Sequence, residues 1–259
     1  MKISIAVAGK GGTGKTTFSA LLVRVLKETG IRPVLAVDAD PNSNLADALG
    51  VEPSRPLADI REKGSSNEGS PASGVGRVRT IEDEIQRAVT EANGFDLITM
   101  GRPEGPRCYC YVNNLLRKSL DNLSKNYEAI VLDNEAGMEH LSRRTTNDVD
   151  FLVVVANPTL PAIRAAKRVV DLCGKLPINI GRQVLLVNRA GPEPFDEEID
   201  RKLAEIDVRR LADIPQDDEI ERAGALERDV FSLPEGTPAL VAVRNVLEAL
   251  RATPSVANE

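Results

Sequence analysis

Two kinds of hydrophobic pattern alternate along the chain. Short, continuous apolar runs rich in β-branched residues are typical of strands buried on both faces of a sheet, and longer stretches carry apolar residues at helical spacing. The predicted strands are Ile3–Ala8, Val34–Val37, Leu97–Met100, Ile130–Leu132, Phe151–Val155, Val184–Val187 and Leu211–Ile214. The predicted helices are Lys15–Glu28, Ile81–Ala92, Leu160–Cys173, Asp196–Ile206 and Pro238–Leu250. The alternation predicts parallel βαβ units in one α/β domain over residues 1–259, with a doubly wound, mostly parallel sheet of about seven or eight strands flanked by helices.

Three segments fall outside this pattern. Gly64–Gly76 is dominated by Gly and Ser, so we expect a surface excursion that is either a disordered insertion or a lid or partner-binding loop. The tail Thr253–Glu259 is predicted to fray. The apolar start of the chain, Met1–Ala8, runs directly into a glycine-rich stretch and reads as a strand and not as a signal peptide. The longest apolar runs are about six residues, against the roughly 20 that a membrane helix needs.

Composition narrows the classes of function. The 259 residues carry Lys+Arg 33 against Asp+Glu 39, a net charge of -6 that disfavours a general nucleic-acid binder. Aromatic residues make up only 3%, which disfavours a base-stacking surface. Three cysteines are too few for a disulfide scaffold in a chain of this length, so we expect a protein of the reducing cytoplasm.

The first predicted strand is followed by a phosphate-binding motif. Residues 9–16 read GKGGTGKT and match G-x-x-x-x-G-K-[ST] between a predicted strand and a predicted helix, the context that the motif requires. Glycines let backbone N–H groups surround a phosphate, and the helix N-terminus adds partial positive charge. Lys15 is expected to reach the β- and γ-phosphates, and the Thr16 hydroxyl to ligate Mg²⁺. The predicted nucleotide-binding residues here are Gly9, Gly11, Gly12, Thr13, Gly14, Lys15, Thr16 and Thr17.

Carboxylates end two further predicted strands. Asp38 and Asp40 follow the second strand, and at the carboxyl end of a parallel sheet they point toward the ligand crevice. The same Asp-Pro sequence is also an ordinary turn and helix cap. Asp133 ends an apolar strand, which fits a Walker B aspartate that holds Mg²⁺ through water. Gly137 would let the segment that follows move with the γ-phosphate.

A second lysine inside the glycine-rich loop, Lys10, resembles the deviant Walker motif of the SIMIBI class, which includes MinD, ParA, the nitrogenase iron protein and metal-insertion ATPases. The resemblance implies a P-loop ATPase that forms a nucleotide-dependent homodimer, in which Lys10 reaches the partner's nucleotide. It further implies that Asp40 positions the attacking water, so that Lys10, Lys15 and Asp40 are the catalytic residues. Asp38 would help to hold Mg²⁺ together with Thr16 and Asp133. The residues that resemble the base-binding positions of this class are Asn188, Arg189, Pro215 and Asp217.

The cysteines separate into a pair and a single residue. Cys108 and Cys110 lie in a Gly/Pro-rich stretch, and two such pairs beside a twofold axis would supply four thiolates for Zn²⁺ or Ni²⁺. Two unremarkable thiols or a redox pair are the alternatives. Cys173 falls within the apolar pattern of a helix and is predicted to be a core residue. His140 is expected to cap or support the mobile switch segment and not to bind metal.

Three stretches together resemble one narrower family. GKGGTGKTT, GRPEGPRCYCYVNNLLR and DNEAGMEHLSRRT are similar in order and spacing to the CooC/AcsF-type accessory ATPases, which mature the nickel centres of carbon monoxide dehydrogenase and acetyl-CoA synthase. The resemblance implies ATP hydrolysis coupled to dimerisation and metal delivery, with ATP/ADP, Mg²⁺ and Ni²⁺ or Zn²⁺ as cofactors and a nickel enzyme as client. Cys108 and Cys110 would then be the metal ligands at the dimer interface. The Gly64–Gly76 excursion and Asn134 after the Walker B aspartate depart from the family pattern.

Two other classes of function use the deviant Walker motif. A MinD/ParA-like positioning ATPase would act on membrane or DNA, but the tail shows neither a basic amphipathic anchor nor a basic run, so we expect neither partner. An electron-transfer reductase like the nitrogenase iron protein would need a cysteine in the switch segment for a [4Fe–4S] cluster, and Asp133–Leu141 contains none.

Overall fold

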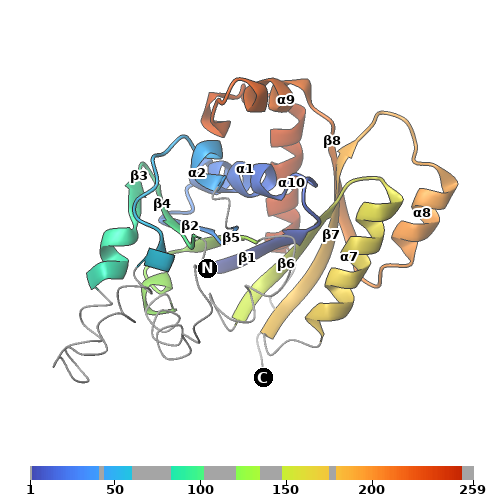
Figure 1. Cartoon of the computed structure of the whole chain (residues 1–259). Coiled ribbons are helices and arrows are strands. Elements are labelled where there is room, and N and C mark those ends of the chain that lie inside the picture. The colour runs from blue at the N-terminus through green and yellow to red at the C-terminus, as the bar shows by residue number, and fades with distance from the viewer. Residues whose placement is uncertain are drawn as a thin grey trace.

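A computed structural model describes residues 2–40, 44–59, 83–101, 121–134, 148–174 and 179–252. Within these ranges eight strands form one sheet in the order β3-β4-β2-β5-β1-β6-β7-β8 (Figure 1). Each neighbouring pair is parallel except β3 and β4, which are antiparallel. The predicted single α/β domain with a doubly wound, mostly parallel sheet is confirmed.

The elements have the following bounds. The strands are β1 (Ile3–Gly9), β2 (Val34–Asp38), β3 (Thr90–Ala92), β4 (Phe95–Thr99), β5 (Ala129–Asp133), β6 (Asp148–Ala156), β7 (Asn179–Ala190) and β8 (Arg209–Pro215). The helices are α1 (Lys15–Glu28), α2 (Leu45–Ala48), α7 (Leu160–Cys173), α8 (Glu197–Ala204), α9 (Asp218–Ala225) and α10 (Pro238–Ala252), with the 3₁₀-helix η1 (Val230–Ser232).

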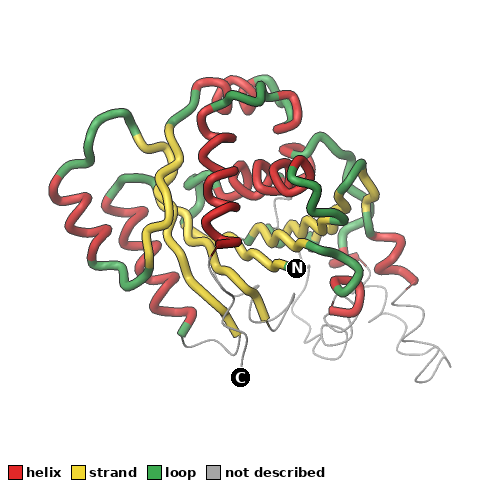
Figure 2. The backbone as a smooth tube through the Cα atoms, turned by 180° about the vertical axis from the view of Figure 1, so that it is seen from behind, coloured by secondary structure: helices red, strands yellow, loops and turns green. Residues whose placement is uncertain are grey.

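The sheet separates two hydrophobic cores. Successive side chains of a strand point to opposite faces, so Ile5 and Val7 of β1 pack with α1 and α10, whereas Ala6 and Ala8 pack on the side of α7 and α8. Figure 2 shows α1 and α10 on the same face of the sheet. All residues of β1, β2 and β5 are buried, which explains why these strands read as continuous apolar runs.

One predicted helix is wrong in its second half. The pattern over Ile81–Ala92 predicts a single helix, but only residues 83–88 are helical among those described, and Thr90–Ala92 form the antiparallel edge strand β3. The chain reverses at Asn93-Gly94, with Gly94 at φ 87°, and Asn-Gly is a strong hairpin signal. The turn and its pairing with β4 therefore override the helical spacing.

The remaining predictions concern the bounds of the helices and the position of Cys173. The helix Lys15–Glu28 is confirmed at both ends, and Cys173 is a buried core residue whose pKa burial raises to about 11. Asp196 is the N-cap of α8 and not its first residue.

The short helices α2 and α9 were not predicted, because too few apolar positions recur in them to define a period. The excursion Gly64–Gly76 and the tail Thr253–Glu259 lie outside the described residues.

The strand register brings the predicted chemistry to one edge. Asp133 of β5 pairs with Val7 of β1 on one side and with Asp38 of β2 on the other. Gly9, at the end of β1, pairs with Val155 of β6. The glycine-rich loop and the two aspartates therefore share the carboxyl edge of the sheet, where α/β proteins bind their ligands. In the described part of the chain, no helix combines the length and the apolar character needed to cross a membrane.

Candidate nucleotide-binding site

The loop between β1 and α1 has the backbone of a phosphate-binding loop. Gly12 and Gly14 have φ values of 79° and 86°, in the left-handed region that favours glycine. A Cβ on Gly9 would lie 2.2 Å from the Val155 carbonyl oxygen, and one on Gly14 would lie 2.3 Å from Nδ2 of Asn188. Glycine is therefore required at both ends of the loop. The loop lies between the strand β1 and the helix α1, which is the context that the motif requires.

The carbonyl of Lys10 organises the inside of the loop. It accepts hydrogen bonds from the Thr13 amide (3.3 Å) and the Thr13 hydroxyl (2.8 Å), and Nζ of Lys15 lies 3.4 Å away. Lys15 is 6% exposed, whereas the Lys10 side chain is exposed. The two lysines of the motif thus differ: one ammonium is held within the loop beside the N-terminus of α1, and the other faces outward.

Two asparagines from neighbouring strands hold the loop from the side. Nδ2 of Asn188, near the end of β7, donates to the Thr13 carbonyl at 2.8 Å. Nδ2 of Asn157, just after β6, donates to the Gly12 carbonyl at 3.4 Å. Sequence reasoning placed Asn188 on the base side and missed Asn157, although its position directly after a buried strand was a usable signal.

Asp38 lies fully buried at the end of β2. One carboxylate oxygen accepts from the Asp40 amide (3.0 Å) and the other from the Leu45 amide (2.9 Å). Burial raises the pKa of Asp38 to about 7, and the neighbouring Asp133 adds to the rise. The Asp38 carboxylate thus holds the backbone at Asp40 and at the first residue of α2, and residues 41–43 between them lie outside the described residues. Asp40 is half-buried, and its charge raises the pKa of Asp133.

Asp133 stands between Asp38 and the phosphate-binding loop. Its carboxylate accepts hydrogen bonds from the hydroxyls of Ser19 (3.2 Å) and Thr16, and Lys15 lies close enough to favour its charge. Burial dominates and raises the pKa of Asp133 to about 6. Two buried carboxyl groups with raised pKa values beside a threonine hydroxyl fit a divalent cation with oxygen ligands, so the donor set suits Mg²⁺.

A cavity of about 300 Å³ adjoins the loop. It lies between the start of α1, the ends of β7 and β8, and the helices α9 and α10. Its walls include Thr17, Asn188, Arg189, Pro215, Asp217 and Ala239. The β7–β8 pairing is irregular between Asn188 and Ala190, and Arg189 takes a φ of 57°, so a bulge shapes this wall. A cavity whose lining combines apolar side chains with several polar ones is typical of a ligand site.

Asp217 lines this cavity and also holds two of the helices around it. One of its oxygens accepts from the Glu219 amide (3.0 Å) at the start of α9, and the other from the Ala239 amide (2.9 Å) at the start of α10. The carboxylate thus caps two helices at once. Sequence reasoning also missed Ile220 and Ala239 in the wall, because neither lies near a recognisable motif.

Other predicted site residues have no described position. Cys108, Cys110, Gly137 and His140 lie outside the described residues. Within the described ranges, no group of three or more His, Cys, Asp or Glu side chains has an arrangement that could hold a metal ion.

The fold and the loop together define a P-loop nucleotide-binding protein of the α/β class. Residues 4–230 match the family described as the CobQ/CobB/MinD/ParA nucleotide binding domain, and the chain belongs to this family.

Individual proteins bear out this membership. An uncharacterised ATP-binding protein of Methanocaldococcus jannaschii is 38% identical over 249 residues, covering 95% of this chain and 97% of that protein. The carbon monoxide dehydrogenase accessory protein CooC of Rhodospirillum rubrum is 35% identical over 188 residues, covering 68% of this chain and 71% of CooC. The cell division ATPase MinD of Pyrococcus furiosus shares the fold, with a TM-score of 0.69 at 23% identity over 97% of this chain and 99% of MinD.

Proposed function

We propose that this protein is an ATP-hydrolysing metallochaperone that binds Ni²⁺ and delivers it to a nickel enzyme of the carbon monoxide dehydrogenase/acetyl-CoA synthase type. The observation that carries the proposal is the 35% identity to CooC, together with the C-x-C stretch GRPEGPRCYCYVNNLLR. In this proposal Cys108 and Cys110 of two copies supply four thiolates, which suit Ni²⁺ or Zn²⁺.

The nucleotide would occupy the loop and the adjoining cavity. Lys15 and the amides of the loop would bind the phosphates, Thr16, Asp38 and Asp133 would hold Mg²⁺, and Asp40 would orient the attacking water. When bound, Mg²⁺ neutralises charge on the phosphates. The base would enter the cavity, whose wall includes Asn188. The amide nitrogen of Asn188 donates to the Thr13 carbonyl, and its amide oxygen could accept a hydrogen bond from the base.

The described residues support a link between nucleotide and metal. Gly101 is the last described residue before Cys108 and Cys110, and the preceding Met100 amide donates to the Asp38 carbonyl at 2.8 Å. The chain therefore enters the cysteine segment from the edge of the sheet that carries the two buried aspartates. If the metal and the nucleotide stabilise one closed dimer, each should tighten binding of the other.

Metal analysis of variants tests the cargo site. We expect about one Ni²⁺ or Zn²⁺ per dimer in the wild type, as a four-thiolate site requires, and loss of the metal in Cys108→Ser and Cys110→Ser. Cys173→Ala is the matched control, because this thiol is buried in the α7 core. Full-stoichiometry metal in both C-x-C variants would overturn the assignment.

Sedimentation tests the dimer. We expect Lys10→Ala to keep nucleotide binding, because its side chain points outward, and to lose dimerisation with a non-hydrolysable ATP analogue. An unaltered dimer would refute the role of Lys10. Vesicle and DNA cosedimentation with ATP separates the alternative, a MinD/ParA-like positioning ATPase, because a metallochaperone should remain in the supernatant.

A further inference from the structure

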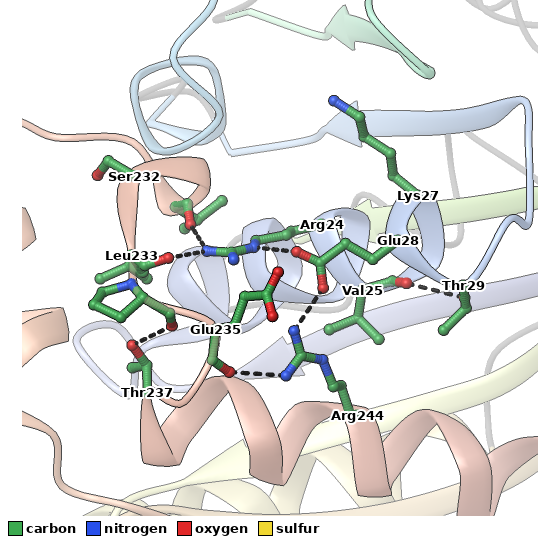
Figure 3. Close-up of polar contacts among 12 residues, drawn as sticks. Arg24, Val25, Lys27, Glu28, Thr29, Ser232, Leu233, Glu235, Thr237 and Arg244 are labelled. Atoms are coloured by element: carbon green, nitrogen blue, oxygen red, sulfur yellow. Dashed lines mark hydrogen bonds and ion pairs between the residues drawn. The ribbon is translucent and has the colours of Figure 1, made fainter.

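A buried arginine joins α1 to the segment that follows α9 (Figure 3). Arg24 is 4% exposed, and its Nη1 donates to the carbonyls of Val230 (2.6 Å) and Leu233 (2.8 Å). Its Nε donates to Glu28 at 2.6 Å. A buried guanidinium is costly unless it is paired and hydrogen-bonded, and these three partners meet that condition.

Residues 229–237, here called the strap, are held at further points by α1, β4 and α10. The Lys27 ammonium lies 4.6 Å from the centre of the Phe231 ring, and this ring stacks on Phe95 at 5.6 Å. Glu28 also accepts from Arg244 of α10 at 2.8 Å, and Arg244 donates to the Glu235 carbonyl at 2.8 Å (Figure 3). Arg24 is the most buried of these contacts and the one that reaches two strap carbonyls.

The strap leads directly to the cavity beside the phosphate-binding loop. It ends at Thr237, and Ala239, two residues later, lines the cavity and donates to Asp217. On the opposite wall, Leu21 of α1 also lines the cavity and lies three residues before Arg24, less than one helical turn away. Arg24 therefore ties one wall of the cavity to the other.

We propose that Arg24 is a positioning residue for the base-binding cavity, which fixes the separation between the α1 wall and the wall formed by α9 and α10. The proposal rests on the proposed binding of a nucleotide with its base in this cavity. The phosphate-binding loop does not depend on the tie, because the loop is held by β1, Asn157 and Asn188. Loss of Arg24 should thus affect recognition of the base and not of the phosphates.

Calorimetry with two ligands tests this separation. Dissociation constants for ATP and for inorganic tripolyphosphate, each with Mg²⁺, are measured for the wild type, Arg24→Lys and Arg24→Met. We expect the affinity for ATP to fall about tenfold in Arg24→Met, because two buried carbonyls lose their donor, and the affinity for tripolyphosphate to stay within about twofold. Arg24→Lys keeps a donor on a differently shaped side chain and should show a smaller loss in the affinity for ATP. Arg251→Met is the control: it removes an exposed arginine from the last turn of α10 and should leave the ratio of the two affinities unchanged.

Binding of tripolyphosphate reports in each variant that the loop is folded. If Arg24 variants do not fold, Phe231→Ala provides a second test, because it loosens the strap at its aromatic contact and should lower the affinity for ATP selectively. An unchanged ratio in the Arg24 variants and in Phe231→Ala would overturn the positioning role. A wild type that binds ATP no tighter than tripolyphosphate would instead overturn base binding in the cavity, and with it the proposed function.

Discussion

The phosphate end and the base end of the candidate site are built in opposite ways. The phosphate end is one unbroken stretch, Gly9–Thr16, whose shape follows from its glycines and from the strand and helix on either side. The base end gathers residues from α1, β7, β8, α9 and α10, which are far apart in the sequence. A local motif therefore specifies one half of the site, and packing specifies the other.

The two ends also use their charged groups differently. At the phosphate end, Asp38 and Asp133 are buried with pKa values raised to about 7 and about 6, an arrangement that a cation would relieve. At the base end, the Asp217 carboxylate is fully engaged in capping α9 and α10. The carboxylates at the phosphate end are therefore placed to bind a cation, whereas the Asp217 carboxylate at the base end stabilises the helices that form the cavity.

Removal of the buried lysine should have the largest effect. We expect Lys15→Ala to abolish measurable nucleotide binding, a loss of about 100-fold or more, because a charge-assisted contact to the phosphates disappears. Isothermal titration with ATP measures the effect. Lys125→Ala is the control, since this exposed lysine bonds only to the nearby Asn122 side chain in the described structure. Comparable losses in both variants would show that net charge, and not the loop, governs binding.

Loss of the double helix cap should weaken the base end. We expect Asp217→Ala to lower the free energy of unfolding by about 1–2 kcal/mol, because two helix N-termini each lose an acceptor, and to weaken ATP binding several-fold. Urea unfolding and titration measure the two effects. Asp196→Ala removes the equivalent cap of α8, whose oxygen accepts from Glu198 at 2.8 Å, and should destabilise without changing affinity. Equal effects of the two variants on affinity would contradict a specific role of the Asp217 cap in the cavity.

The asparagine between the two ends should have an intermediate effect. Asn188→Leu keeps the approximate size of the side chain and adds no charge, but it removes the donor to the Thr13 carbonyl, and a neutral hydrogen bond is worth about 0.5–1.5 kcal/mol. We expect nucleotide affinity to fall by roughly two- to tenfold. Because the contact joins both ends, the affinity for ATP and for tripolyphosphate should fall together. A loss confined to ATP would place Asn188 on the base side alone.

The raised pKa values predict a modest dependence of stability on pH. Because Asp38 and Asp133 bind protons more tightly in the folded chain than in the unfolded one, their contribution favours folding at low pH and is lost as pH rises through about 6 to 7. Without Mg²⁺, Asp38→Asn should therefore lose less stability than the wild type between pH 5 and pH 7.5, because the side chain no longer titrates. A difference on the order of 1 kcal/mol corresponds to about 2–4 °C in melting temperature for a chain of this size.

Thermal unfolding at the two pH values measures this difference. Asp171→Asn, at an exposed site on α7, is the control and should show the wild-type pH dependence. A wild type that gains stability between pH 5 and pH 7.5 relative to Asp38→Asn would contradict the assigned pKa directions.

Predictions from the sequence were confirmed where they rested on a local pattern. They were wrong or missing where a segment distant in the chain supplies the contacts that determine the structure. The helix Lys15–Glu28 follows from apolar spacing after a glycine loop, and its bounds are confirmed. The helix predicted over Ile81–Ala92 fails because β4 offers hydrogen bonds to Thr90–Ala92 once the chain turns at Gly94. Asn157 and Ala239 carry no motif, and they belong to the site only because the strands and helices bring them there.

The sequence by itself determined the fold class, the phosphate-binding loop and the strand-end aspartates, because apolar periodicity and glycine conformation act over a few neighbouring residues. The tertiary structure alone decided which groups meet across the molecule. It places Asp38 beside Asp133, commits Asp217 to two helix caps, and ties α1 to the strap through Arg24. The physical reason is that burial and hydrogen-bond partners, which set the role of a polar group, come from segments far away in the chain.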